Sequence, residues 1–511
     1  MTTPAPGGWL RLAQVTDPAT RATRQAEVAP QTGAGSTGSG IKSAGHLEEV
    51  IVTAQKREEN LFKAPIAINV YSGETLQRSV IQDTGELALA EPSLIANQVS
   101  AGGSNVFIRG VGNEIVGVGT DSSVAMYLDG VYPAALHHGA AKFRRCRAYR
   151  SRQRSPRFSN YDGRQVRLAG GGPIAGETLL ARAAVTYEER DHYAYNPFLN
   201  QRLKGEDLVA GNLQLKWLPT ADLEFLLRYD QIHDDAAAAF AVKVVEPSAP
   251  PRAPVPQDPF TINSDLPDTR TELRSKGASL LANWTLGNYL LSSQTAWRDF
   301  STFANFDSDG YELPLNHFLV TEDSESVSEE LRLSYRGGGP FEWLAGVFYF
   351  EETVLQDIRV ARVIPVIGDL EVQAWAVFAD ASYRLTERLE LTAGVRYSYE
   401  GKDHLASVLG NISAQSTDVE DWDAVTPRFV ASYDVSDDVL LYASASRGFK
   451  SGGFNSVGNE PPVDPEFLWS YEAGLKGTML EERLQMALTA FYYDSWESNS
   501  PPPRRRCSRC C

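Results

Sequence analysis

Residues whose types and spacing could do chemistry are sparse in this chain of 511 residues. The tail CSRCC offers Cys507 and Cys510 as thiolates for a metal ion or a redox exchange, but no second cysteine pair accompanies them. His137 and His138 are adjacent, a spacing that rarely lets two imidazoles face one metal ion. The sequence contains no G-x-S-x-G motif and no Ser-His-Asp pattern among its seven histidines. It therefore predicts no enzyme, no catalytic residue, no metal site and no cofactor.

The composition narrows the class of partner. The formal net charge is −17, from 48 basic and 65 acidic residues, which argues against a general nucleic-acid binder. No run of about 18 apolar residues occurs, so the sequence predicts no transmembrane helix. A transmembrane β-barrel remains compatible with this composition, because its strands alternate lipid-facing and lumen-facing residues.

Two arginine-rich patches differ abruptly from the rest of the chain. Seven arginines and no acid lie within residues 144–157, just after Lys142, and four arginines lie within 504–511. All four cysteines fall in these patches: Cys146, Cys507, Cys510 and Cys511. Such a change indicates translation in a different reading frame, with a genuine polybasic loop as the alternative. We expect the patches to make few contacts and to form no shared site.

The N-terminal region contains a leader and then a β-prone segment. Residues 1–46 are rich in Gly, Ala, Thr, Ser and Pro, which predicts disorder, and their start lacks the apolar region of a signal peptide. The true N-terminus is therefore expected to be altered or missing. Residues 47–61 follow, with the core VIVT at 50–53. A segment of this kind can pair with a partner through main-chain hydrogen bonds, or it is simply the first strand of the next domain.

Residues 62–136 carry short predicted strands and helices. We expect a strand over 64–70, a helix that begins after the capping residue Ser72, a second helix from about 83, and strands over 106–108 and 124–128. Each of the last two strands ends in a charged residue followed by glycine, at Arg109-Gly110 and Asp129-Gly130. Glycine permits the positive φ of a sharp reversal. This order predicts a small α/β domain.

From about residue 165 onward, apolar and polar residues alternate strictly over eight to twelve residues at a time. Short turns, as at 219–222, alternate with long polar connections, as at 233–270. This alternation is typical of an antiparallel transmembrane β-barrel with short turns at one end and long loops at the other. Many strands also end in aromatic residues that fit interfacial girdles, namely Trp217, Tyr229, Tyr335, Tyr397 and Tyr492.

Several segments resemble the TonB-dependent outer-membrane receptors: LEEVIVT at 47–53, EPSL at 91–94, IRGVG at 108–112, YLDGVY at 127–132 and YASASRGFKSGGFN at 442–455. The resemblance implies a TonB box at Leu47, Glu48, Glu49, Val50, Ile51, Val52 and Thr53. It implies plug motifs at Arg109, Gly110, Asp129 and Gly130, where Arg109 and Asp129 are expected to be packing and turn residues rather than ligand contacts. It also implies a barrel signature at Arg447, Gly448, Phe449, Lys450, Gly452, Gly453, Phe454 and Asn455.

The chain departs from the family in length and in one motif. The family's LRGPQG…YG…GG segment is missing after Leu136, and about 14 strands are predicted where 22 are typical. The predicted fold is therefore mainly β, with an N-terminal α/β plug domain and an incomplete antiparallel transmembrane β-barrel. The predicted domains are a disordered leader (1–46), a TonB-box segment (47–61), an incomplete plug (62–136), an aberrant Arg-rich segment (137–159), a partial β-barrel (160–494) and an aberrant tail (495–511).

The function that the resemblance implies is active uptake of a scarce nutrient, with a ferric siderophore as the expected substrate, in the outer membrane of a Gram-negative bacterium. Its partners would be a TonB-type energising protein, outer-membrane lipid and a small-molecule or metal-chelate substrate, with no nucleic acid. Two alternatives stay open: an inactive fragment of such a receptor, and a passive porin-like channel. The loop sequences do not identify the substrate.

Overall fold

The computed structural model describes residues 51–52, 56, 59–79, 81, 84–98, 104–112, 118–132, 149–151, 163–191, 194–203, 205–236, 260–308, 312, 317–360, 364–408, 415–454, 462–479 and 484–497. The N-terminal elements are β1 (Ile51–Val52), β2 (Glu59–Asn60), α1 (Gly73–Arg78), α2 (Thr84–Ala90), β3 (Leu94–Gln98), β4 (Ser104–Ile108) and β5 (Val111–Gly112). We call the described residues 59–132 the plug. Neither helix combines the length and apolar character that crossing a membrane would require.

The remaining described elements are all strands. They are β6 (Tyr149–Ser151), β7 (Gly163–Ala175), β8 (Leu179–Arg190), β9 (Ala194–Asn196), β10 (Gln201–Leu203), β11 (Glu206–Thr220), β12 (Leu223–Ala236), β13 (Arg270–Leu286), β14 (Tyr289–Asp307), β15 (His317–Tyr335), β16 (Phe341–Val360), β17 (Ile364–Arg384), β18 (Leu389–Val408), β19 (Gln415–Ser436), β20 (Val439–Lys450), β21 (Glu466–Met479) and β22 (Leu484–Glu497).

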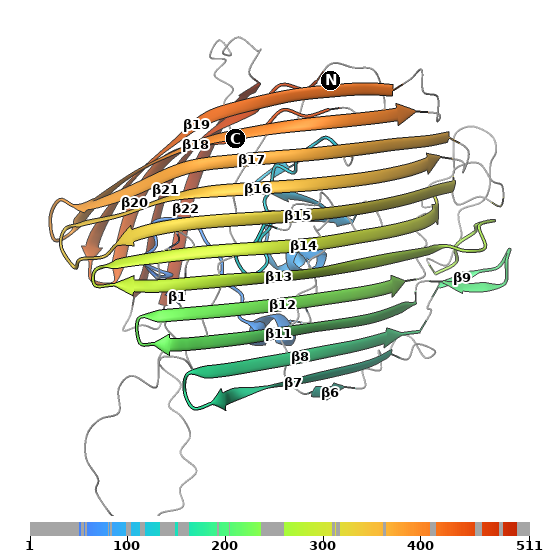
Figure 1. Cartoon of the computed structure of the whole chain (residues 1–511), viewed down its shortest axis with the longest axis horizontal. Helices are drawn as coiled ribbons and strands as arrows, with labels where there is room; N and C mark the ends of the chain where they lie inside the picture. The colour runs from blue at the N-terminus through green and yellow to red at the C-terminus, as the bar shows by residue number, and fades with distance from the viewer. Residues whose placement is uncertain are drawn as a thin grey trace, which may run out of the picture.

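Most of these strands form one antiparallel sheet. Its order runs from β22 through β11 to β8, β7 and the three-residue β6, so neighbours in the chain are neighbours in space (Figure 1). Within the described residues it contains 14 long strands, which confirms the predicted number and the antiparallel pairing. Turns of two to five residues lie at one end of the strands, whereas the connections at the other end range from residues 361–363, between β16 and β17, to residues 237–269, between β12 and β13 (Figure 1).

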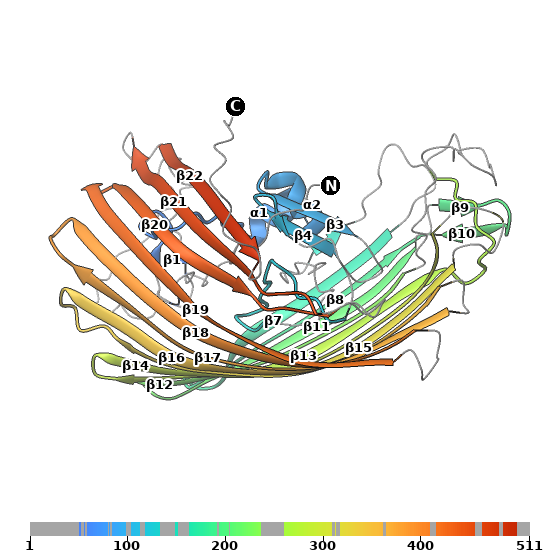
Figure 2. The same ribbon diagram turned by 90° about the horizontal axis from the view of Figure 1, so that it is seen from above.

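The sheet curves into an open trough, and the plug lies in its concave side (Figure 2). This arrangement confirms the predicted combination of an N-terminal plug with a partial barrel. Strand β22 ends the sheet on one side, and β7 with the short β6 ends it on the other, among the residues that are described.

The alternating sequence pattern separates the two faces of the sheet. On β15, Ser324, Ser326 and Glu322 are buried, and Ser324 Oγ donates to Glu352 on β16 at 2.8 Å. These polar positions share the concave face that touches the plug. Large apolar residues at alternate positions are exposed on the convex face, among them Val327, Leu331, Val347, Val377, Val395 and Phe429.

Aromatic residues form two rows on the convex face. The pairs Tyr289 and Trp297 on β14, Phe341 and Tyr349 on β16, and Trp375 and Tyr383 on β17 are each eight residues apart. Neighbouring strands keep these rows in register, since Phe341 pairs with Tyr383 and Tyr349 with Trp375. Eight residues of strand span about 26 Å along the strand direction, so the two rows border a continuous apolar band.

The plug has a small apolar core of its own. Ile81, Leu87, Leu94, Val106, Ile108 and Val124 pack together. Helix α1 begins after Ser72, whose Oγ accepts the Thr75 amide at 3.1 Å, as predicted for a capping residue.

Two predicted strands of the plug are wrong. Residues 64–70 form bends and extended chain, and residues 124–128 contribute only the single bridge between Leu128 and Val131. Their apolar character reflects packing without a partner strand. Val124 packs into the plug core, and Ala64 is fully buried.

Candidate functional site

The plug contains two pairs in which a charged residue precedes a glycine, and each pair forms a tight turn. Arg109 and Gly110 have φ of 53° and 80°, and Asp129 and Gly130 have φ of 53° and 85°. Positive φ at two consecutive residues is the geometry of a type I′ turn, which favours glycine at the second position. Both turns touch the barrel wall: the Asp129 carbonyl accepts a hydrogen bond from Gln294 Nε2 on β14 at 3.2 Å, and Arg109 makes the contacts described next.

Arg109 forms a buried ion pair with the barrel wall. Its Nη1 donates to Glu472 Oε2 on β21 at 2.8 Å, and the side chains are only 15% and 10% exposed. The guanidinium also lies 4.4 Å from the Phe491 ring centroid on β22. Burial by itself would lower the pKa of Arg109, but the hydrogen bonds to Glu472 and Tyr493 outweigh it and raise that pKa. Arg109 therefore stays charged and holds the β4–β5 turn against the wall.

The same part of the wall holds the first residues of the plug. Glu472 Oε1 accepts the Ala67 amide at 2.9 Å and the Tyr442 hydroxyl at 2.6 Å. Lys476 Nζ donates to the carbonyls of Ala64, at 2.9 Å, and of Ile66. Strand β21 thus uses two side chains to bind backbone in the 64–67 segment, which has no partner strand to satisfy its polar groups, and Tyr442 of β20 supports one of them.

Glu91, from the EPSL motif, fixes the inside of the plug. Its carboxylate accepts hydrogen bonds from Asn69 at 2.6 Å, Tyr71 at 2.9 Å and the Ser93 hydroxyl at 2.7 Å. Burial opposes ionisation, but these hydrogen bonds outweigh it and lower the pKa of Glu91. This carboxylate links the segment before α1 to the turn before β3.

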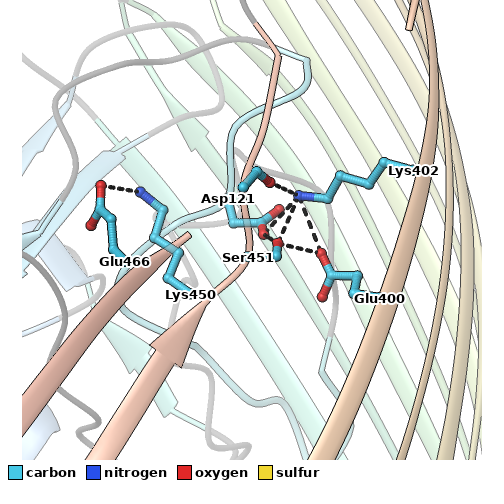
Figure 3. Close-up of polar contacts among 7 residues, drawn as sticks. Asp121, Glu400, Lys402, Lys450, Ser451 and Glu466 are labelled. Carbon is cyan, nitrogen blue, oxygen red and sulfur yellow. Dashed lines mark hydrogen bonds and ion pairs between the residues drawn. The ribbon is translucent and has the colours of Figure 1, made fainter. Parts of the chain in front are cut away.

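A second ionic contact centres on Lys402 of β18, whose side chain is fully buried. Its ammonium lies 2.8 Å from Asp121 Oδ2 of the plug and 3.1 Å from Glu400 Oε1 of the same strand (Figure 3). It also donates to Ser451 Oγ and to the Gly452 carbonyl, both at 3.0 Å. Burial would raise the pKa of Asp121, but the Lys402 charge and its hydrogen bonds lower it. One buried cation therefore joins plug, wall and the connection after β20.

That connection enters the concave side of the sheet at residues 451–454, which we call the latch. The Phe454 amide donates to the Gly119 carbonyl of the plug at 2.8 Å. The Phe454 ring stacks on His404 with centroids 5.1 Å apart. A Cβ on Gly453 would lie 2.2 Å from the Gly119 oxygen, so the approach of the two backbones requires glycine there.

The barrel signature meets the plug at Gly119, through Phe454, whereas Arg109 of the plug motifs contacts β21 and β22 instead. Lys450, Gly452, Gly453 and Phe454 all lie at the latch or beside it, and Lys450 pairs with Glu466 at 3.5 Å. Arg447 lies over the Phe467 ring at 4.1 Å. Sequence reasoning missed Lys402, Asp121 and Glu472, since their partners lie 281 and 363 residues away. Such pairings become visible only once the sheet is built.

Other predicted residues fall largely outside the described part of the chain. They are Asn455, the four cysteines, the two adjacent histidines and most of the predicted TonB box. Of the box, Ile51 and Val52 are described as β1, which pairs with Asn60 and Glu59 of β2. Just beyond, Lys56 forms an ion pair with Glu330 on β15 and lies 5.1 Å from the Phe378 ring. The segment after the box is therefore attached to the concave wall.

The comparisons agree with this architecture. Residues 227–496 match the family described as TonB dependent receptor-like, beta-barrel, and residues 60–162 match the TonB-dependent receptor plug domain. The chain is 33% identical to the metal-pseudopaline receptor CntO of Pseudomonas aeruginosa over 123 residues, which is 24% of this chain and 17% of that receptor. It is 27% identical to the pesticin receptor of Yersinia pestis over 143 residues, 27% of this chain and 21% of that receptor. These matched segments are thus about a fifth of each receptor's length.

Solved structures show the same fold. The ferric yersiniabactin uptake receptor FyuA of Yersinia pestis superposes with a TM-score of 0.67 at 17% identity, over 83% of this chain and 71% of that one. The ferripyoverdine receptor of the Pseudomonas aeruginosa outer membrane, bound to ferripyoverdine, superposes with a TM-score of 0.64 at 15% identity. The superposition covers 88% of this chain and 66% of that receptor. The barrel match covers more than half of the chain, and the plug match precedes it. The chain belongs to the TonB-dependent receptor family.

Proposed function

We propose that the protein takes up a metal chelate, most simply a ferric siderophore, across the outer membrane of a Gram-negative bacterium. A TonB-type protein that pairs with the segment at 47–53 would supply the energy. Three of the four relatives reported above are named as receptors for metal or iron chelates, which supports this substrate class, and the fourth is named for pesticin. The convex face would contact lipid through its apolar band between the two aromatic rows.

The single observation that carries the proposal is the way the plug is held. It is attached to the wall by side chains, through Arg109 to Glu472 and through Asp121 to Lys402. Ion pairs and hydrogen bonds of this kind can be broken and remade without unfolding the sheet. A plug that is docked rather than built into the sheet suits a pathway that must open under force and close again. None of these contacts positions a nucleophile or a general base.

The experiment expresses the full chain in a Gram-negative host that lacks its own ferric-siderophore receptors. A panel of ⁵⁵Fe-loaded siderophores is offered with and without a protonophore, and surface binding and accumulation are measured together. The proposal expects accumulation of at least one chelate that the protonophore abolishes while surface binding persists.

Two results would contradict the proposal. Accumulation that the protonophore leaves unchanged, and that depends only on solute size, would identify a passive porin-like channel. Neither binding nor accumulation of any chelate, from protein that reaches the outer membrane, would identify an inactive fragment of a receptor.

A further inference from the structure

Three side chains capable of binding a metal ion converge away from the plug, at the long-loop end of the sheet. They are Asp265, Asp307 and His317, and one ligand atom from each lies within 4.8 Å of the other two. Asp307 is 4% exposed and His317 is 7% exposed. The His317 Nε2 atom lies 2.6 Å from Asp265 Oδ1. The group is therefore compact, with Asp307 and His317 buried and Asp265 partly exposed.

Two of the three residues are placed by the register of the sheet. Asp307 is the last residue of β14, His317 is the first of β15, and the two are direct cross-strand partners. Directly opposed residues project from the same face of an antiparallel pair, with Cβ atoms about 5 Å apart. The carboxylate and the imidazole are thus held side by side by two strands.

The third residue lies on a segment before β13, residues 260–269, that is fastened at several points. The Tyr195 amide donates to Phe260 O at 2.8 Å, and Asn196 Nδ2 donates to Ser264 O at 2.8 Å. Leu266, next to Asp265, is 1% exposed. Asp265 is consequently presented to His317 by ordered backbone that is also bonded to β9.

The ligand chemistry favours a divalent transition metal. The group carries two carboxylates and at most one positive charge, so a divalent cation would compensate the charge that burial makes costly. One imidazole with two carboxylate oxygens suits zinc-like ions, whereas calcium and magnesium prefer oxygen alone. Zinc bonds to such ligands are about 2.0–2.2 Å long, which separates neighbouring ligand atoms by roughly 3.3 Å. Since the ligand atoms lie within 4.8 Å of one another, the ion would draw them together by up to about 1.5 Å and would replace the 2.6 Å hydrogen bond between His317 and Asp265.

We infer that Asp265, Asp307 and His317 form a binding site for one divalent transition-metal ion that joins the 260–269 segment to the outer ends of β14 and β15. The ion is structural and distinct from any transported chelate, since the site lies on strand ends rather than along the plug. Binding would stabilise the β9–β10 hairpin, because that hairpin is bonded to the same segment at Tyr195 and Asn196.

The test uses the purified full chain in detergent, stripped of metal, with Cys146, Cys507, Cys510 and Cys511 changed to serine so that thiolates cannot bind zinc. Zinc binding is measured by calorimetric titration, and Co²⁺ is used as a spectroscopic probe of His and carboxylate ligation. His317→Ala and the nearly isosteric Asp265→Asn are compared with His233→Ala. His233 is a matched control because its Nδ1 lies 3.9 Å from the Glu272 carboxylate, yet it belongs to no group of three possible metal ligands within the described residues.

We expect one equivalent of zinc to bind, with affinity reduced at least about tenfold by His317→Ala and by Asp265→Asn and unchanged by His233→Ala. The cobalt bands should disappear in the same two variants. Zinc binding of equal strength in all four proteins would overturn the proposal, as would no specific binding to the parent. If the circular dichroism of His317→Ala shows that this variant has lost its β-sheet, its loss of zinc binding is not informative. The zinc affinity of Asp265→Asn then decides whether the site exists.

Discussion

Arg109 in the plug and Glu472 on β21 are joined by a 2.8 Å ion pair although 363 residues of chain separate them. Glu472 uses its other oxygen to hold the Ala67 amide, so one carboxylate binds two separate parts of the plug. The stability of plug docking should therefore depend on this carboxylate more than on any exposed ion pair.

Glu472→Ala is expected to destabilise the protein by about 3–5 kcal/mol, because it leaves the buried Arg109 charge without its partner. Urea unfolding in detergent measures the loss. Lys63→Ala is the control, since the Lys63–Asp434 pair is about 40% exposed on both sides and should contribute no more than about 1 kcal/mol. In a double-mutant cycle, Arg109→Ala should cost much less once Glu472 is gone. Additive costs would show that the pair does not dock the plug.

The contact between Asp121 and Lys402 should depend on pH in a defined direction. The folded protein lowers the pKa of Asp121, so this contact contributes its full stability above the ordinary Asp value of about 4. The contribution is lost as the pH falls through the lowered folded value. We expect the plug contact to persist at pH 5 and to break only in stronger acid.

Trp422 reports this transition, because Lys402 Nζ lies 5.7 Å from its ring. Subtracting the fluorescence of Trp422→Phe from that of the parent isolates the Trp422 signal. This signal should change at a pH below the ordinary pKa range of Asp, and Asp121→Asn should abolish the change. Lys63→Met, which removes the separate and exposed pair with Asp434, should leave it in place. A midpoint above pH 5 would be inconsistent with a stabilised Asp121 carboxylate.

The latch should not tolerate a single added methyl group. A Cβ on Gly453 would lie 2.2 Å from the Gly119 oxygen, and one on Gly452 would lie 2.4 Å from the Trp422 ring and from Val463 O. Gly453→Ala should therefore cost about 1–3 kcal/mol and lower the apparent melting temperature. Gly339→Ala, in a turn with open space around the new atom, should have little effect. Equal melting temperatures for the two variants would refute the steric argument.

The predicted TonB box, Leu47–Thr53, remains a prediction from sequence. Val50→Pro removes a backbone donor and fixes φ, so it should weaken pairing with the energising partner by roughly 1–3 kcal/mol. Energised uptake should be lost while surface binding of the chelate persists, and Val50→Ile should behave like the parent. Normal uptake by the proline variant would disprove the box, and loss of surface binding as well would assign the segment a structural role.

The sequence predicted the sheet far better than the plug contacts. Alternation along a strand such as β16 is a local signal, and the apolar convex side makes it strong. In the plug, residues 64–70 and 124–128 are short apolar runs without that alternation, and their apolar character reflects packing rather than strand pairing. Lys402 and Asp121 carry no local signal, because each is an ordinary polar residue until the register of β18 brings them together. The same holds for Asp265 and His317.

The eight-residue spacing between the aromatic rows also sets the bilayer in which this sheet can sit without strain. A band of about 26 Å along strands that tilt by about 40° spans roughly 20 Å along the membrane normal. That is less than the average hydrocarbon thickness of about 30 Å, and bacterial outer membranes are thinner than average. In a thicker membrane the bilayer would have to become thinner around the protein to match the distance between the two rows. One row contains Tyr289, Phe341 and Tyr383, and the other contains Trp297, Tyr349 and Trp375. Hydrophobic mismatch would therefore direct this protein toward thin membranes.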